Sequence, residues 1–347
     1  MILRSRGRAA AGLALAALGL AASAPAPAPL RALRWLSPAA DPVAALTRAP
    51  PECYAPAADP EQAWREEVGR AAFRTPLLLG GQAARAGVSC ETCHRSGRDN
   101  PDFDFPGVSL GHPGSADVTS SLFSSHRGDG IDNPRPIPDL GGPREALKVS
   151  RAPEGRALET FIDGLVTQEF DGAEPPPAVL DGLAAYVRAL RPEACPPGGD
   201  RPVTLAGTFN DAERALVAAE GALRRGDAPS AVLLTGAARS ALGRIDERYA
   251  VPELSPLRAG LRAADLDLAA IQARIRRSDP AAGEAILLWR TNSGALRTAL
   301  AAREDRSLFS AARLARALAA SPAGASPGTP PGSGPPLRPA RPSGAAR

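Results

Sequence analysis

Several residue types are scarce in this chain of 347 residues, and each scarcity excludes a class of protein. Lys148 is the only lysine, and no block of like charges occurs, although the formal net charge is +4. Residues 1–24 hold three arginines and no acid, so without them the net charge is only +1. A nearly neutral chain without basic runs is not expected to bind nucleic acid.

Long apolar runs are also missing. The longest, residues 9–22, is shorter than the ~20 residues that a membrane span needs. Because it follows a basic start and ends in small residues, we expect residues 1–24 to be a signal peptide, cleaved near Ala21 to Ala24. The mature protein would then be periplasmic and have no membrane span. An uncleaved anchor is the alternative.

Composition divides the remaining chain into four parts. Residues 25–51 are rich in Ala and Pro and are expected to form a tether. A first folded region, residues 52–197, ends at a Pro-Pro-Gly-Gly boundary. A second, wholly helical region covers residues 208–320. In residues 321–347, 13 of 27 positions are Pro or Gly, so this tail is expected to be disordered.

Hydrophobic periodicity predicts an all-α fold. In the first region, helices are predicted to start near Glu61 and to cover the apolar stripes at 158–166 and 179–190. Residues 96–147 show little periodicity and many Gly, Pro, Asp and Ser. A loop of this length inside a compact domain is usually functional, and a bound group is a candidate for what it encloses.

The second region contains an apparent internal duplication. Arg224-Arg225-Gly226-Asp227 matches Arg276-Arg277-Ser278-Asp279, and apolar triplets follow both at 232–234 and 286–288. Each copy would be a helical hairpin that turns at this motif, and two hairpins would form a four-helix bundle. Asn210 with Glu213 is predicted to cap the first helix. Accidental similarity between Ala/Arg-rich helices is the alternative interpretation.

The strongest chemical signal is Cys90-Glu91-Thr92-Cys93-His94. This C-x-x-C-H spacing is typical of c-type haem attachment: two thiols one helical turn apart bind the haem covalently, and the histidine ligates its iron. Zinc binding would require a second Cys or His pair. A redox C-x-x-C would require a thioredoxin-like context. We therefore predict one covalent haem c on Cys90 and Cys93, with His94 as proximal ligand.

The other two cysteines, Cys53 and Cys195, lie at the two ends of the first region. In an oxidising compartment, such an even remainder predicts a disulfide. Two free thiols are the alternative.

The second axial ligand is restricted by the scarcity of methionine. Met1 is the only methionine and leaves with the signal peptide, so His/Met ligation is excluded in the cleaved protein. His112 and His126 are the remaining histidines, and either would give a bis-histidine iron. An iron open to water or peroxide is the third possibility.

From about residue 73 to 190 the chain resembles the first haem domain of the bacterial di-haem cytochrome c peroxidase and MauG-like family. The resemblance rests on residues 87–94, on Ser109-Leu110-Gly111-His112, and on Phe161-Ile162 with the later Glu169-Phe170 and Gly172. In that family a Gly-His at comparable distance supplies the distal ligand, which implies that role for His112. Family members also carry a second C-x-x-C-H, which this chain lacks.

Two functional hypotheses follow. The first is an electron-transfer cytochrome whose redox partner is another cytochrome or a periplasmic oxidoreductase. The second is a peroxidase-like enzyme that depends on an external electron donor. The missing second haem motif favours the first, and no residue is predicted to be catalytic. A haem protein with the helical region as its assembly surface is a third possibility.

Overall fold

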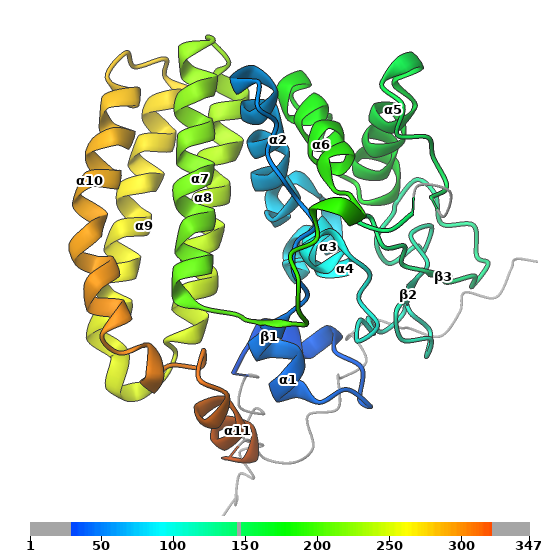
Figure 1. Ribbon diagram of the computed structural model, residues 1–347, viewed down its shortest axis with the longest axis horizontal. Coiled ribbons are helices and arrows are strands. Elements are labelled where there is room, and N and C mark those ends of the chain that lie inside the picture. Colours follow the sequence, from blue (N-terminus) through cyan, green and yellow to red (C-terminus); the bar gives the residue numbers. More distant parts are fainter. Residues whose placement is uncertain (1–28, 144–146, 321–347) are drawn as a thin grey trace, which may run out of the picture.

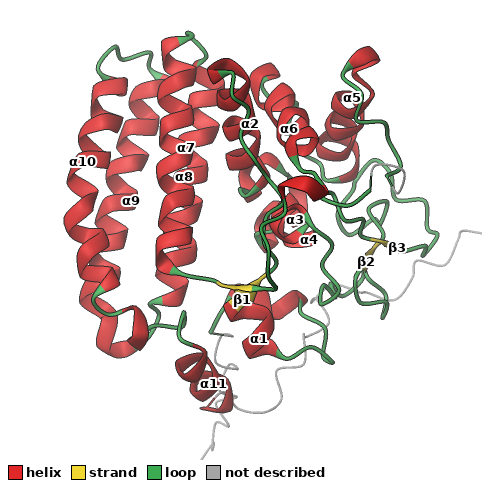
Figure 2. Cartoon of the chain, in the orientation of Figure 1, coloured by secondary structure: helices red, strands yellow, loops and turns green. Residues whose placement is uncertain are grey.

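The computed structural model describes residues 29–143 and 147–320. The predicted signal peptide and disordered tail lie outside these residues. The described chain is mostly helical, as predicted, with only four two-residue strands. Figures 1 and 2 show α7 to α10 side by side, α2 next to α7, then α6, and an irregular segment with β2 and β3 at the far side.

The expectation of a tether over residues 25–51 is wrong for the part that the structure describes. A 3-10 helix, Arg31–Trp35, and helix α1, Pro42–Thr47, form there, and the side chains of Trp35 and Leu46 are buried. Strand β1, Arg48–Ala49, then pairs with β4, Arg201–Pro202. Apolar residues spaced among the Ala and Pro residues gave this segment enough side-chain surface to fold onto the rest of the molecule.

The three helices predicted in the first region are confirmed. Asp59 caps α2, Pro60–Phe73, by accepting the backbone N–H of Gln62. The stripe at 158–166 becomes α5, Ala157–Gly164, followed by a π-helical turn, Leu165–Glu169, and the third stripe becomes α6. The remaining elements of this region are α3, Gly81–Ala86; α4, Cys90–Cys93; β2, Ser115–Ala116; β3, Arg135–Pro136; and α6, Pro177–Ala189.

Four helices of the second region form two hairpins that turn where the sequence predicts, and a fifth helix follows them. Gly226 and Ser278 occupy equivalent turn positions and both have positive φ, +72° and +56°. After the first turn, the Asp227 side chain caps the next helix by accepting the N–H of Ser230. The helices are α7, Leu205–Arg224; α8, Ala228–Arg248; α9, Ser255–Arg276; α10, Ala282–Ala301; and α11, Ala311–Ala320.

The predicted cap at Asn210 is wrong. Helix α7 starts earlier, at Leu205, because the hydroxyl of Thr204 accepts the N–H of Gly207 and supplies the cap. Asn210 lies inside the helix, where its side-chain oxygen accepts a hydrogen bond from Arg297 of α10 at 3.1 Å.

The two regions share one hydrophobic core, and α2 lies at their junction. On one side, Gly69 of α2 meets Gly182 of α6 with no room for a Cβ atom between the backbones. On the other side, the Trp64 indole donates to the carbonyl of Ala218 at 3.2 Å and packs against Gly221 of α7. Most buried apolar residues of both regions belong to one contiguous cluster, and a smaller one joins Leu30 and Leu46 to Leu308 and Leu314. The second region is therefore packed directly on α2, whose Phe73 ring lies 6.4 Å, between ring centroids, from the ring of His94.

Candidate functional site

The C-x-x-C-H motif forms the single helical turn α4. The turn begins at Ser89, whose backbone N–H is accepted by the Thr92 hydroxyl at 3.0 Å, so the helix is capped from within the motif. Positions i and i+3 share a helix face, which places Cys90 and Cys93 together. Both are free thiols and half-buried, and burial raises the pKa of each to about 12.

His94 follows this turn and is held in one orientation. Its Nδ1 lies 3.0 Å from the carbonyl oxygen of Pro138. A carbonyl can only accept, so Nδ1 carries the proton and Nε2 keeps a free lone pair. Burial lowers the pKa of His94 to about 4 and so keeps the ring neutral. A neutral imidazole with one nitrogen anchored to a carbonyl is the form in which histidine binds metals.

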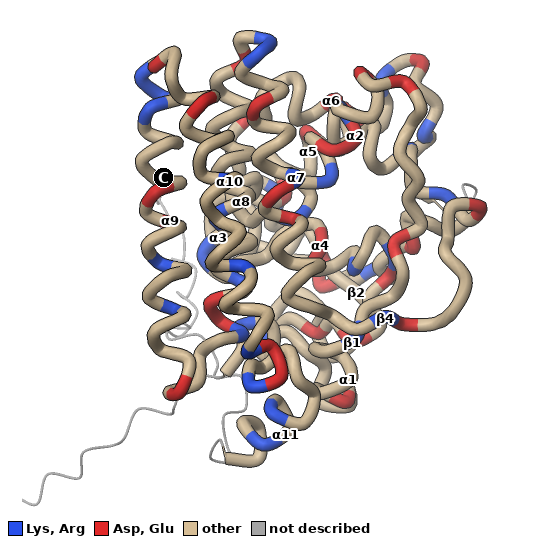
Figure 3. The backbone as a smooth tube through the Cα atoms, turned by 60° about the vertical axis from the view of Figure 1, so that its left-hand side comes forward, with Lys and Arg blue, Asp and Glu red and all other residues tan. Residues whose placement is uncertain are grey.

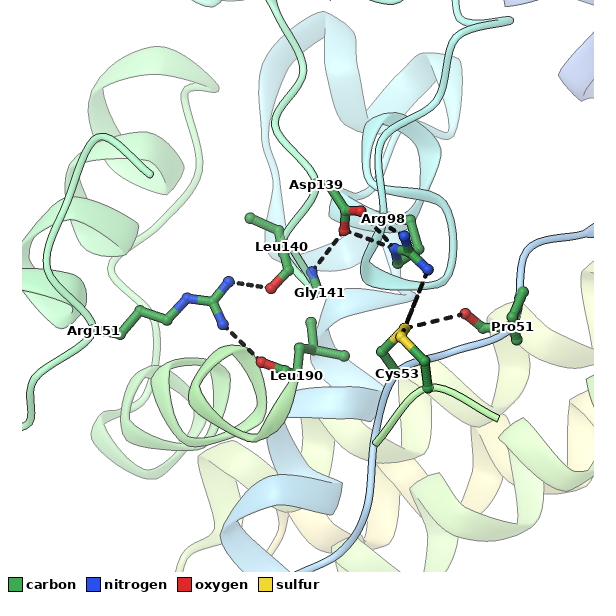
Figure 4. Close-up of a disulfide and its surroundings, with 9 residues drawn as sticks. Pro51, Cys53, Arg98, Asp139, Leu140, Gly141, Arg151 and Leu190 are labelled. Atoms are coloured by element: carbon green, nitrogen blue, oxygen red, sulfur yellow. Dashed lines mark hydrogen bonds and ion pairs between the residues drawn. A yellow bond between two sulfur atoms is a disulfide. The ribbon is translucent and has the colours of Figure 1, made fainter. Parts of the chain in front are cut away.

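The carbonyl that anchors His94 is itself held in place. Asp139, next to Pro138, accepts from Arg98 Nε at 2.7 Å, and its Oδ1 also accepts the N–H of Gly141 at 2.8 Å. Arg98 Nη1 reaches Cys53 Sγ at 3.2 Å, and Cys53 is bonded to Cys195 in the predicted disulfide. Figure 4 shows Arg98 between Asp139 and the sulfur atoms. The disulfide thus lies against the loop that orients His94.

Arg151 holds the same loop from its other side. This buried side chain donates from Nη1 to the carbonyls of Val187 and Leu190, at 3.0 and 2.7 Å, and from Nη2 to the carbonyl of Leu140. Figure 4 shows the guanidinium between Leu140 and Leu190. The end of α6 is therefore tied to the segment that carries Pro138.

The opposite face of α4 contacts the second region through charge. Glu91 accepts the N–H of Ser96 at 2.9 Å and lies 3.7 Å from Arg74 Nη2. Arg74 also pairs with Glu52 at 2.8 Å and lies 3.9 Å from Asp211 of α7. Burial raises the pKa of Glu91, and Arg74 opposes this rise. An ionic network therefore connects the motif to α7.

The long irregular segment predicted around a bound group is organised by aromatic side chains. Phe105 stacks on Trp35 with their ring centroids 6.1 Å apart, and it meets Phe123 edge-on with a centroid separation of 5.0 Å. The ring centroids of Phe123 and Phe170 are 5.6 Å apart. Several apolar side chains of the first region pack against the core but remain only partly buried: Cys90, Cys93, Phe105, Val118, Leu122, Leu140, Ile162 and Phe170. The first region therefore keeps apolar side-chain surface available to a large apolar group.

Both candidates for the second axial ligand lie in this segment and are exposed. His112 follows Leu110 and Gly111, which have positive φ of +53° and +78° and form a tight turn. His126 is 57 % exposed, and its Nε2 lies 3.8 Å from Asp171 Oδ1. The assignment of either residue to the iron stays a prediction.

No protein-family model, curated protein or solved structure matches the chain. Within residues 29–143 and 147–320, no three His, Cys, Asp or Glu side chains gather as a metal-ion group, and no helix is long and apolar enough to cross a membrane. The resemblance to the peroxidase family stays a prediction.

Sequence reasoning found the residues that would hold the haem but missed those that position them. The anchor of His94 is a backbone carbonyl, which leaves no side-chain signature. Arg98 and Asp139 lie 41 positions apart, so their pairing had no local pattern.

Proposed function

We propose that this protein is an exported mono-haem c-type cytochrome. Cys90 and Cys93 hold the haem covalently, and His94 is its proximal ligand. A haem bound here supplies a one-electron redox centre. The observation that carries the proposal is a capped C-x-x-C-H turn with two free thiols and a neutral His94, anchored through Nδ1 to the Pro138 carbonyl.

The chain's own residues fix the proximal side. The Pro138 carbonyl sets the orientation and tautomer of His94, while Arg98 and Arg151 keep that carbonyl in place. A rigid ligand suits electron transfer, because little rearrangement then accompanies a change of oxidation state. The redox partner would be another cytochrome or a periplasmic oxidoreductase, consistent with export of a disulfide-bonded chain.

One observation favours the peroxidase-like alternative. Glu169, in the π-helical turn, is buried, and its Oε2 has no hydrogen-bond partner among the described residues. Burial raises the pKa of Glu169, although Arg127 lies 3.4 Å from its Oε1 and opposes the rise. A buried carboxyl of this kind can hold a proton, as a peroxidase-like reaction requires. An external electron donor would still be required.

The attachment claim is tested by secreting the chain together with a c-type maturation system. Wild-type protein should keep its haem after denaturation and give a c-type pyridine haemochrome spectrum. Cys90→Ala with Cys93→Ala should release all of it. The matched control, Cys53→Ala with Cys195→Ala, removes two cysteines outside the motif and should retain covalent haem. Wild-type protein that denatures without haem would refute the proposal.

The choice between the two functions is tested by peroxide. An electron-transfer protein with two histidine ligands should be low-spin and should not change its spectrum on adding peroxide. His112→Ala should then convert the iron to high spin, whereas His126→Ala should not. A wild-type iron that is high-spin and reacts with peroxide, with a rate that falls in Glu169→Gln, would favour the enzyme.

A further inference from the structure

A large cleft lies between the two regions, on the side of α4 away from the thiols. Its volume is about 1090 Å³, slightly above the range of about 300–1,000 Å³ for small-molecule sites. Glu91 and Thr92 line it, whereas Cys90, Cys93 and His94 do not. The opposite wall comes from α7, α8 and α9, and the segment 31–51 forms one end. A ligand in this cleft would not compete with a haem on the thiols.

The cleft is strongly basic although the chain as a whole is not. Ten arginines and six carboxylates line it, while acidic and basic positions are mixed along the rest of the chain, as Figure 3 shows. Most of these arginines pair with carboxylates; Arg239, for example, binds Asp265 at 2.8 Å. The positive excess therefore resides in the arginines without such partners.

Three lining arginines have no carboxylate partner within the part of the chain that the structure describes: Arg95, Arg201 and Arg248. Arg248 donates only to backbone carbonyls, those of Leu46 at 2.6 Å and Leu308 at 2.9 Å. Arg95 donates to the carbonyl of Arg48. Burial, and next the positive charge of Arg95, lower the pKa of Arg248 to about 10. The positive charge of Arg95 lowers this pKa more than the nearby Glu247 raises it. An excess of like charge of this kind favours binding of an anion.

The same cleft has an apolar part. Trp35, Leu46, Leu242, Leu261 and Phe309 line it, and the Arg248 guanidinium lies over the Phe309 ring at 5.2 Å. An occupant should therefore combine an anionic group with an apolar body. The ends of the chain outside the described residues do not meet this requirement, because residues 1–28 and 321–347 contain arginines and no Asp or Glu.

We propose that this cleft binds an amphipathic organic anion, whose carboxylate or phosphate headgroup pairs with Arg95, Arg201 and Arg248 and whose apolar body packs beside Trp35 and Phe309. A guanidinium fork matches both headgroups through paired hydrogen bonds. The proposal does not depend on the haem, because the two sites lie on different faces of α4.

The test is isothermal calorimetry on the full-length secreted protein at fixed ionic strength. The probes are octanoate, octyl phosphate, inorganic phosphate and octylammonium. Octanoate or octyl phosphate, or both, should bind at one site per chain; which of them binds more tightly identifies the headgroup. Inorganic phosphate should bind at least tenfold more weakly because it has no apolar body. Octylammonium should not bind.

Variants locate the site. Arg248→Gln and Arg201→Gln should each weaken binding of the alkyl anions tenfold or more. The control Arg276→Gln, an exposed arginine of α9 outside the cleft, should leave binding unchanged. Arg201 makes no side-chain hydrogen bond to the described residues, so its variant remains informative if Arg248→Gln fails to fold. No binding of either alkyl anion at millimolar concentration, equal binding of octylammonium, or unchanged affinity in Arg201→Gln would overturn the proposal.

Discussion

At the scale of single residues, the site depends on side chains held by groups far away in the sequence. The five-residue motif at 90–94 was enough to predict the roles of His94 and both thiols, and the structure adds the side chains and carbonyls that hold them. Glu52 is connected to the motif through Arg74, from which it accepts at 2.8 Å, and it also accepts from the Tyr186 hydroxyl at 2.6 Å. Burial alone would raise the pKa of Glu52, but Arg74 and Arg70 outweigh it and lower the pKa to about 2.

This lowered pKa predicts how stability depends on pH. A carboxyl whose folded pKa lies below its unfolded pKa stabilises the fold above the unfolded value and loses that contribution as pH falls. A shift from 4.5 to about 2 corresponds to about 3 kcal/mol at neutral pH, lost between about pH 5 and pH 2. Glu52→Gln should therefore lower the free energy of unfolding at pH 7 by about this amount and flatten its acid dependence.

Urea unfolding of wild type and variant across pH 2 to 7 measures the effect. The exposed Glu284 provides the control, because Glu284→Gln should change stability by less than about 0.5 kcal/mol. A wild type and Glu52→Gln that remain equally far apart at pH 2 and pH 7 would contradict the assignment.

At the scale of elements, local sequence predicted which segments are helical better than where each begins. The two hairpin turns could be predicted because the Arg-Arg-x-Asp run recurs at 224–227 and 276–279. The structure adds that the third position of each run, Gly226 and Ser278, has positive φ. The start of α7 was misplaced because Asn210 resembles a cap as closely as Thr204 does, and packing selected the earlier residue. The contact between α2 and α6 had no visible signature, since an isolated glycine in each helix is common.

That contact gives the second prediction. A Cβ on Gly182 would lie 2.8 Å from the Arg65 carbonyl oxygen and 2.9 Å from the Gly69 nitrogen, so one of the helices must shift. Gly182→Ala should lower the free energy of unfolding by roughly 1–3 kcal/mol, the usual cost of overpacking. Gly294→Ala is the matched control: it is helical and has no atoms within 4 Å of the added methyl. It should stabilise by about 0.4–1 kcal/mol.

Thermal or urea unfolding of the two alanine variants shows whether the destabilisation comes from the close α2–α6 contact or from replacing a helical glycine in general. If both variants stabilise the protein equally, the short distances at Gly182 do not prevent a larger residue from fitting between α2 and α6, and the prediction is wrong.

At the scale of the whole molecule, composition predicted separate parts, but the structure joins them. The expected tether folds from residue 29 onward, and the two regions share a core through α2. Composition could not show this because the joining residues, such as Trp64 and Ala218, are 154 positions apart. The basic cleft could not be predicted for the same reason, because its arginines belong to separate segments that come together only in the fold.

The disulfide gives a prediction at this scale. It spans 142 positions, and the chain-entropy model assigns about 5 kcal/mol to a loop of that length. Cys53→Ser with Cys195→Ser should lower the free energy of unfolding by up to this amount. The double variant should also weaken the ion pair of Arg98 with Asp139, because Arg98 then loses its contact with Cys53 Sγ. The redox midpoint of the proposed haem should shift as a result. Wild type treated with reductant should match the variant; equal stability of oxidised and reduced protein would contradict the expected contribution.

The most direct test of the central claim is the intact mass of the denatured protein after secretion with a c-type maturation system. We predict a mass that exceeds the polypeptide mass by one haem, with no free thiol at Cys90 or Cys93. A protein at its polypeptide mass, with both thiols free or joined to each other, would contradict it.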